Sequence, residues 1–151
     1  MEKDIKMIPY TDDDYNFVYE VKKEAYKKYV EECFGSWDEE DQKNRFKDNM
    51  NKSQSITSII VVNDKKVGFY QGKLLDDNTY YIENICVGSE FRGNGIGSII
   101  LKNIISEYRD KDIKIQYFKQ NPVGNLYKRL GFIPDGETEF HYQMIKPKEQ
   151  K

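Results

Sequence analysis

The sequence predicts an α/β (α+β) fold in which a mixed, mostly antiparallel sheet is flanked by helices. Three observations support this class. Three apolar segments in the middle of the chain are separated only by short polar turns, which is typical of an antiparallel meander. A strand, a glycine-rich turn and an apolar helix come next. A second strand–helix unit and two further strands then complete the chain.

The N-terminal third is predicted to hold one strand and two helices. Residues 4–9 include an alternating stretch that is typical of a half-buried strand. Thr11 precedes three aspartates and is a natural N-cap for a helix that runs to about Val30. The inward face of this helix is formed by Val18, Val21, Ala25 and Tyr29. Phe34-Gly35-Ser36-Trp37 ends it, and a second helix is expected over about 38–49.

The meander and the glycine-rich turn occupy the centre of the chain. The expected strands are 56–62, 67–75 and 79–87, and the polar turns between them are 63–66 and 76–78. The helix that follows is expected over 95–108. Its apolar stripe is formed by Ile100, Leu101, Ile104, Ile105 and Tyr108.

The C-terminal part is predicted as a strand, a short helix and two closing strands, at 112–118, 122–130, 132–133 and 138–145. Asn121 is a natural N-cap, and Pro122 suits the first helical position. Gly131 is placed to end the helix in the left-handed conformation. We expect 1–151 to form a single domain in which 147–151 are a frayed tail.

Composition argues against several classes of protein. With 24 basic and 26 acidic residues the formal net charge is −2, so no nucleic-acid partner is expected. No apolar run is long enough to span a membrane, and the charged N-terminus does not resemble a signal peptide, which favours a cytoplasmic protein. Cys33 and Cys86 are too few for a disulfide framework, and one histidine without a cysteine pair at ligand spacing predicts no metal site.

The segment Arg92-Gly93-Asn94-Gly95-Ile96-Gly97-Ser98 predicts an anion site at a helix start. Glycines allow a ligand to approach the backbone, and the first N–H groups of a helix have no internal acceptor. A dinucleotide-binding fold needs G-x-G-x-x-G, but Ser98 stands at the last position, and no lysine follows for a P-loop. The remaining alternative is a glycine-rich turn before an ordinary helix.

Two motifs in this chain resemble those of the GNAT N-acetyltransferase superfamily. The first is Arg92-Gly93-Asn94-Gly95-Ile96-Gly97, which matches the acyl-CoA-binding signature R/Q-x-x-G-x-G/A. The second runs from Asn121 to Phe132 and matches N-x-x-x-x-x-Y-x-x-x-G-F, with Tyr127 as its tyrosine. The resemblance covers about 57–147, and the chain is similar to small bacterial-type single-domain members.

The resemblance implies a sheet that is splayed between its two central strands, with acetyl-CoA or coenzyme A as cosubstrate and no metal. The acetyl group would pass to a primary amine by direct attack in a ternary complex. Backbone groups of the strand before the loop would pair with pantetheine, and the loop would hold the pyrophosphate. The implied cofactor-binding residues are Ile85, Cys86, Val87, Arg92, Gly93, Asn94, Gly95, Ile96, Gly97, Ser98, Asn121 and Tyr127.

The resemblance also implies catalytic groups. Tyr127 would protonate the departing thiolate, and the same ring could also serve as a core aromatic. The Val87 N–H would stabilise the oxyanion. Strand alternation puts Glu83 on the face of Ile85 and Val87, so Glu83 is the expected base, although it could equally be a structural hydrogen-bonding group. His141 is a second candidate base.

The acceptor side is predicted from an aromatic-rich segment. Tyr26, Tyr29, Phe34 and Trp37 either fill a helix–helix contact or form a wall of the acceptor pocket, and the expected substrate-binding residues are Tyr26, Tyr29, Trp37 and His141. Glu31 or Glu32 could attract a cationic amine. The acceptor could be a small molecule or a peptide, and the protein a monomer or homodimer. Alternative functions are acyl-CoA binding without turnover, in a sensory or structural role, and acetylation of protein N-termini or lysines.

Overall fold

A seven-stranded sheet forms the centre of the molecule. The structure is a computed structural model that describes residues 4–52, 55–75 and 77–149. The strand order is β1-β2-β3-β4-β5-β7-β6. Neighbouring strands are antiparallel except β4 and β5, which are parallel. The predicted α/β class with a mixed, mostly antiparallel sheet is therefore confirmed.

The elements follow the predicted order. The strands are β1 (Ile5–Pro9), β2 (Ile56–Val62), β3 (Lys65–Leu74), β4 (Tyr80–Val87), β5 (Ile113–Phe118), β6 (Ile133–Glu137) and β7 (His141–Lys146). The helices are α1 (Tyr15–Phe34), α2 (Glu39–Lys52), α3 (Ile96–Glu107) and α4 (Gly124–Arg129), and two short 3-10 helices are η1 (Asp12–Asp14) and η2 (Ser89–Phe91). The predicted meander is formed by β2, β3 and β4, in which each strand is antiparallel to the next one along the chain.

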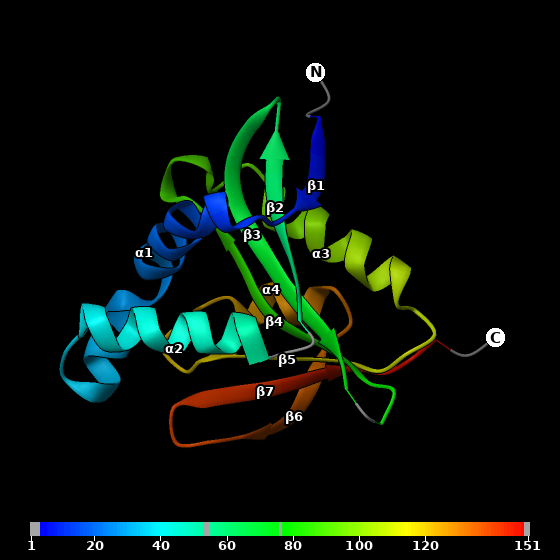
Figure 1. The fold of residues 1–151 in the computed structure, drawn as a ribbon. Coiled ribbons are helices and arrows are strands. Elements are labelled where there is room, and N and C mark those ends of the chain that lie inside the picture. Colours follow the sequence, from blue (N-terminus) through cyan, green and yellow to red (C-terminus); the bar gives the residue numbers. More distant parts are fainter. Residues whose placement is uncertain (1–3, 53–54, 76, 150–151) are drawn as a thin grey trace.

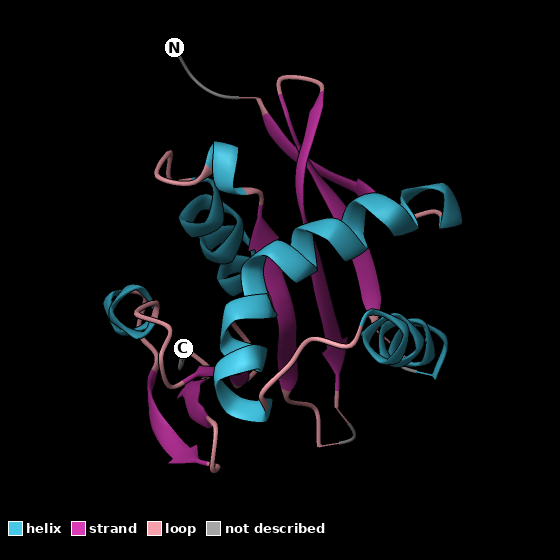
Figure 2. Ribbon diagram, turned by 90° about the vertical axis from the view of Figure 1, so that its left-hand side faces the viewer, coloured by secondary structure: helices cyan, strands magenta, loops and turns pink. Residues whose placement is uncertain are grey.

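Helices cover both faces of the sheet (Figures 1 and 2). Helices α1 and α2 lie on one face, and α3 and α4 lie on the other. Two apolar clusters fill the resulting layers. The cluster beneath α1 and α2 includes Val18, Tyr19, Phe46, Ile59, Phe69 and Cys86. The cluster beneath α3 and α4 includes Tyr80, Ile82, Ile96, Ile100, Ile104, Ile113 and Phe132.

Helix α1 extends four residues beyond its predicted end. It continues to Phe34 and stops at Gly35, whose φ of 89° is left-handed. The Gly35 N–H donates to the Glu31 carbonyl at 2.8 Å, which satisfies one of the last carbonyls of the helix. The glycine, rather than the preceding aromatic residue, sets the boundary, and the last turn of the helix brings Cys33 to Gln120 and Phe34 to Phe140.

The described residues 147–149, which lie in the predicted tail, form two hydrogen bonds through their backbone N–H groups. The Lys148 N–H donates to a carboxylate oxygen of Asp112 at 2.8 Å. The Glu149 N–H donates to the Arg109 carbonyl at 2.8 Å. These bonds hold the tail against the loop between α3 and β5, and residues 150–151 lie outside the described residues.

The entry to α1 is stabilised by Asp14, whose side chain is buried. Its carboxylate accepts a hydrogen bond from the Thr11 N–H at 3.0 Å and another from the Lys66 ammonium of β3. The bond from Lys66 is the main reason that the pKa of Asp14 lies below its ordinary value of 3.8, and burial opposes the shift. Asp14 thus ties the first helix to β3, the middle strand of the meander.

Replacing Asp14 by asparagine is expected to lower the free energy of unfolding by about 1–2 kcal/mol at neutral pH, after allowing for the solvent exposure of Lys66. A native pKa below the unfolded value means that this stabilisation is complete above pH 3.8 and disappears as pH falls through the native pKa. Urea unfolding of the wild-type protein and the Asp14→Asn variant, from acidic to neutral pH, tests this expected loss of stability. Asp13→Asn changes an exposed carboxylate and serves as the control. Equal stability at neutral pH would contradict the role given to Asp14.

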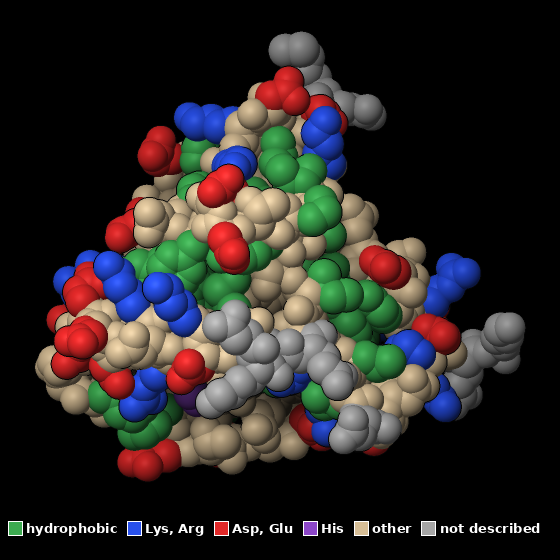
Figure 3. All heavy atoms as spheres, in the orientation of Figure 1, with side chains coloured by type: hydrophobic (Ala, Val, Ile, Leu, Met, Phe, Trp, Pro, Cys, Tyr) green, Lys and Arg blue, Asp and Glu red, His purple; other side chains and the backbone are tan. Residues whose placement is uncertain are grey.

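Charged side chains are interspersed on the surface. On the face in Figure 3, acidic and basic groups lie among one another rather than in areas of one sign. None of the helices in the described ranges combines the length and apolar character needed to cross a bilayer.

Candidate active site

The two parallel strands at the centre of the sheet separate along their length. Strands β4 and β5 pair only through residues 80–82 and 113–115, and beyond these residues they share no ladder. The Gly88 N–H donates to the Val67 carbonyl, so the pair formed by Val87 and Gly68 is a non-hydrogen-bonded one. Because such pairs alternate, the N–H and carbonyl groups of Ile85 and Val87 point away from β3, into the opening.

The glycine-rich loop opens onto the same place. Gly93 and Gly95 have left-handed φ angles of 83° and 75°. The first backbone hydrogen bond of α3 runs from the Ile99 N–H to the Gly95 carbonyl at 3.0 Å, so the N–H groups of 96–98 precede the intrahelical ladder. No heavy atom lies within 4 Å of a Cβ built on Gly93, Gly95 or Gly97. The loop therefore presents helix-start donors to open space.

A cavity of about 280 Å³ joins this loop to the strand opening. Its lining is Ile85, Val87, Phe91, Arg92, Gly93, Gly95, Ile96, Gly97, Ser98, Leu101, Val123, Leu126 and Tyr127. Most of the residues predicted to hold a cofactor thus lie around one space. The helix-start N–H groups at this space suit a phosphate group.

Three predicted cofactor residues lie elsewhere. The side chain of Cys86 is buried against α1, on the opposite face of β4. Asn94 does not line the small cavity, and its side-chain amide donates to the Phe91 carbonyl at 3.2 Å. The Asn121 side chain accepts a hydrogen bond from the Val123 N–H at 3.1 Å, but Val123 is the N-cap of α4, so the predicted N-cap at Asn121 and first helical position at Pro122 are wrong by two residues.

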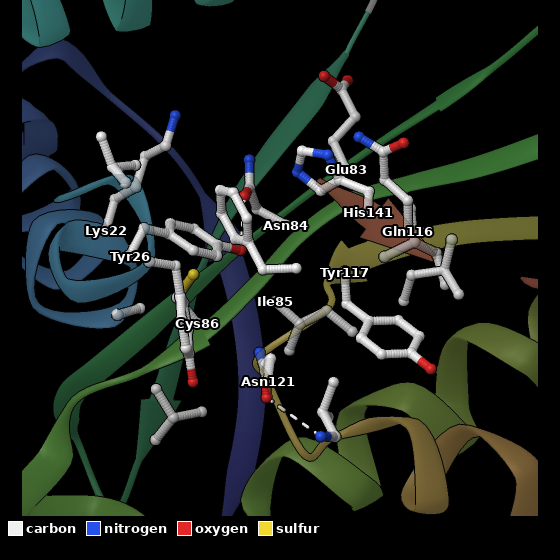
Figure 4. A pocket seen from close by; sticks show the side chains of 18 of the residues that line it. Lys22, Tyr26, Glu83, Asn84, Ile85, Cys86, Gln116, Tyr117, Asn121 and His141 are labelled. Atoms are coloured by element: carbon white, nitrogen blue, oxygen red, sulfur yellow. Dashed lines mark hydrogen bonds between the residues drawn. The ribbon is translucent and has the colours of Figure 1, made fainter. Parts of the chain in front are cut away.

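A larger cavity of about 550 Å³ lies between β4, β5 and α1. Part of its wall is aromatic and is formed by Tyr26, Tyr29, Trp37, Tyr81, Tyr117, Phe118 and Tyr127, together with His141. All four residues expected to bind the acceptor are therefore brought together, from α1, the α1–α2 connection and β7. Figure 4 shows the polar ends of Lys22, Glu83, Gln116 and His141 toward one end of this cavity, and Asn121 toward the other.

The two cavities meet at the strand opening. Both are lined by Ile85, Val87, Arg92, Val123 and Tyr127. A molecule that entered along the glycine-rich loop could therefore present its end to a second molecule in the larger cavity. This continuity is the geometry that a direct transfer between two bound ligands requires.

Tyr127 stands at this junction with its hydroxyl protonated. Its ring lies 5.6 Å from that of Tyr117 and 5.8 Å from that of Phe132, measured between centroids. Burial is the main cause that raises the pKa of Tyr127 well above its ordinary value of 10.0. The side chain thus packs as a core aromatic and still keeps a proton that it could donate.

Glu83 does not share a face with Ile85 and Val87, which corrects the expectation from simple alternation. The register of β3 against β4 shifts between Gln71 and Gly72, where Glu83 is the extra residue of a bulge. Ile85 and Val87 pack toward α3, whereas the Glu83 carboxylate accepts a hydrogen bond from the Ser55 hydroxyl. Glu83 lines only the larger cavity, and Figure 4 shows it directed away from Ile85.

The predicted aromatic cluster divides into three parts. Tyr26 and Tyr29 lie against Phe118 of β5, at centroid distances of 6.0 and 5.5 Å. Phe34 is instead 60% exposed, and the centroid of its ring lies 4.7 Å from that of Phe140. The Trp37 indole donates to the Tyr19 hydroxyl at 3.2 Å while it lines the larger cavity.

The carboxylates expected to attract an amine also lie elsewhere. Glu31 and Glu32 are exposed on α1, and neither lines the larger cavity. Glu83 is the carboxylate that lines the larger cavity. Lys22 lines it as well, and this cation was not predicted from the sequence. Lys22 is four residues before Tyr26 and seven before Tyr29, so helical spacing could have placed it on the same face.

A second missed residue, Glu24 on α1, fixes the start of the glycine-rich loop. Its two carboxylate oxygens accept hydrogen bonds from the Ser89 N–H at 2.7 Å and the Ser89 hydroxyl at 3.0 Å. The Arg92 guanidinium lies 3.7 Å from the same carboxylate, and its Nε donates to the Val87 carbonyl at 2.9 Å. Arg92 is thereby held beside the opening by both α1 and β4.

Comparison with known proteins agrees with these features. Residues 22–132 match the model of the acetyltransferase (GNAT) family. The chain is 33% identical over 95 residues to an uncharacterized N-acetyltransferase ycf52 of Pyropia yezoensis, a match that covers 58% of this chain and 53% of that protein. The chain thus spans about half the length of the curated relatives that it matches.

Solved structures share the whole fold. One, described as histone acetyltransferase HPA2 and related acetyltransferase from Corynebacterium glutamicum, has a TM-score of 0.77 at 18% identity and covers 97% of this chain and 98% of that one. The PaiA N-acetyltransferase of Thermoplasma acidophilum, solved with coenzyme A, has a TM-score of 0.70 at 17% identity. The match covers 97% of this chain and 99% of that one. With the family match over most of its length, this chain belongs to the acetyltransferase (GNAT) family.

Proposed function

We propose that the chain is an N-acetyltransferase that moves an acetyl group from acetyl-CoA to a primary amine by direct attack in a ternary complex. The observation that supports this most is the junction of the two cavities at the opening between β4 and β5. The smaller cavity offers helix-start N–H groups for a pyrophosphate and strand-edge groups for pantetheine amides. The larger cavity offers space for an amine beside the thioester.

The proposed reaction uses few groups. The neutral amine nitrogen attacks the thioester carbonyl, a C–N bond forms, the C–S bond breaks, and the amine loses a proton. The Val87 N–H, which faces the opening, would stabilise the oxyanion. Tyr127 would give its proton to the departing thiolate and regain one from solvent.

Proton removal from the acceptor falls to Glu83 or His141, which both line the larger cavity. Burial lowers the pKa of His141 below 6.5, so its imidazole is neutral and basic at neutral pH. A base acts on every acceptor alike. Replacement of the base by glutamine should therefore lower kcat toward all amines to the same extent, and mostly at low pH.

Contacts around the larger cavity favour a small acceptor over a protein. Phe34 at the end of α1 contacts Phe140 in the β6–β7 turn, and Tyr29 contacts Phe118. The Gln120 side chain also donates to the Cys33 sulfur at 3.7 Å. These contacts join α1 to β5 and the β6–β7 turn, so an extended peptide would have to part them. Acetylation of a protein N-terminus or lysine and acyl-CoA binding without turnover remain the competing outcomes of the test.

Calorimetry with acetyl-CoA, followed by thiol release with a panel of primary amines and short peptides, tests the proposal. We expect acetyl-CoA to bind in the micromolar range and thiol release to depend on a small amine. For peptides, we expect kcat/KM to be at least about tenfold lower than for the best small amine. Binding without thiol release for any amine would favour a non-catalytic role. Faster reaction with peptides would assign a protein acceptor.

A further inference from the structure

Besides Arg92 at the junction, the larger cavity is lined by two charged side chains, one of each sign. Lys22 of α1 and Glu83 of β4 both line it, and each is half-buried. Among the described residues neither side chain forms an ion pair within 4.0 Å, although other acidic and basic side chains of this protein do. Charges that are partly removed from water without a partner are compensated when a ligand supplies the opposite charge.

Each charge has a local contact that fixes its position without neutralising it. The Lys22 ammonium lies 4.4 Å from the centre of the Phe46 ring, which holds it by a cation–π contact. The Glu83 carboxylate accepts the Ser55 hydroxyl through Oε1, which leaves acceptor capacity on the carboxylate. Burial lowers the pKa of Lys22, and the nearby Cys86 and Glu83 oppose this shift.

The positions of the two charges define one polar end of the cavity. Figure 4 shows the Lys22 ammonium and the Glu83 carboxylate directed toward the end that is remote from Asn121 and α4. The junction with the smaller cavity lies at the opposite end, at Val123 and Tyr127. The bulge at Glu83 creates this arrangement, because it turns the carboxylate away from the face of Ile85 and Val87.

We propose that the acceptor is a small diamino carboxylic acid whose zwitterionic end is held by Lys22 and Glu83 while its distal amine is acetylated. The proposal rests on the proposed acetyl transfer. Lys22 binds the carboxylate, and Glu83 binds the α-ammonium group. Tyr26, Tyr29 and Phe118 line the space between the two ends and contact the methylene chain. Glu83 is then an acceptor-binding residue rather than the base.

Four amines distinguish the contributions of the acceptor's carboxylate and of its α-ammonium group. Lysine carries both, 1,5-diaminopentane lacks the carboxylate, 6-aminohexanoate lacks the α-amine, and pentylamine lacks both. For the wild-type protein we expect kcat/KM to be highest for lysine and to fall about tenfold or more with the loss of each charged group. The product from lysine should carry the acetyl group on its side-chain amine, which NMR of the product identifies.

Two variants assign each charge to its residue. Glu83→Gln should remove the advantage of lysine over 6-aminohexanoate, and Lys22→Met should remove its advantage over 1,5-diaminopentane. Lys22→Met should leave kcat/KM for pentylamine within about twofold of wild type, and the loss that Glu83→Gln causes with lysine should exceed any loss that is common to all four amines. Matched controls are Glu107→Gln on α3 and Lys27→Met on α1, which are exposed and line neither cavity of the proposed site.

Three results would overturn the proposal. Lysine could react no better than pentylamine, Glu83→Gln could slow all four amines equally, or none of the four could react although acetyl-CoA binds. Failure of the proposed function itself looks different, because acetyl-CoA would then fail to bind or no amine in the wider panel would release thiol. Calorimetric titration of lysine into the CoA-loaded protein gives a readout that is independent of turnover.

Discussion

The Gly97→Asp variant is expected to fold normally and to lose acetyl-CoA affinity by about a hundredfold or more. Gly97 lines the smaller cavity, its φ is not among the left-handed ones, and a Cβ would meet no heavy atom within 4 Å. Aspartate is a better helix former than glycine, and a negative charge in the first turn stabilises the helix. The same charge repels a pyrophosphate, by up to about 4 kcal/mol for unit charges 4 Å apart at a protein surface.

This substitution separates binding from folding better than a change at Gly95. Gly95 has a φ of 75°, so any side chain there strains the loop even where space is open. Asn103→Asp adds the same charge on the exposed side of α3 and serves as the control. Calorimetry with acetyl-CoA and a thermal melt of each variant provide the comparison. Unchanged affinity in a folded Gly97→Asp protein would mean that the loop does not hold the pyrophosphate.

The second large effect is expected for Tyr127→Phe, which should lower kcat about 10²-fold and leave acetyl-CoA affinity unchanged. Phenylalanine keeps the ring contacts with Tyr117 and Phe132 and removes only the hydroxyl. Because burial keeps this hydroxyl protonated, the wild-type group can serve as the acid throughout the neutral range. Stopped thiol-release assays at saturating acetyl-CoA measure the change.

Tyr142→Phe removes a hydroxyl from a partly exposed ring outside both cavities and is the matched control. If kcat for Tyr127→Phe equals that of this control, Tyr127 is a packing residue and the thiolate takes its proton from water. A lower affinity for acetyl-CoA with unchanged kcat would instead make it a binding residue.

The sequence was sufficient for the features that depend on local chemistry. Glycine spacing identified a loop that lines a cavity, and Gly131 follows the short helix with a positive φ of 101°, as its type allows. Helical periodicity also placed Tyr26 and Tyr29 on one face, and both reach the larger cavity. These features depend on the conformational preferences of a few neighbouring residues.

The features that depend on pairing between distant segments could not be predicted in this way. The bulge at Glu83 arises from the register of β3 against β4, and no residue type in the sequence of β4 predicts a bulge there. A one-residue shift changes which face a side chain occupies, so the expected position of Glu83 was wrong. The contact of Phe34 with Phe140 likewise joins residues far apart in the sequence.

The attachment of Glu24 to Ser89 and Arg92 has a thermodynamic consequence for the two substrates. Helix α1 supplies Lys22, Tyr26 and Tyr29 to one cavity, and through Glu24 it also holds the loop that lines the other. An acceptor that displaces α1 must therefore alter the affinity for acetyl-CoA. Linkage requires acetyl-CoA to alter acceptor affinity by the same factor, so this contact can couple the two binding equilibria and favour an order of addition.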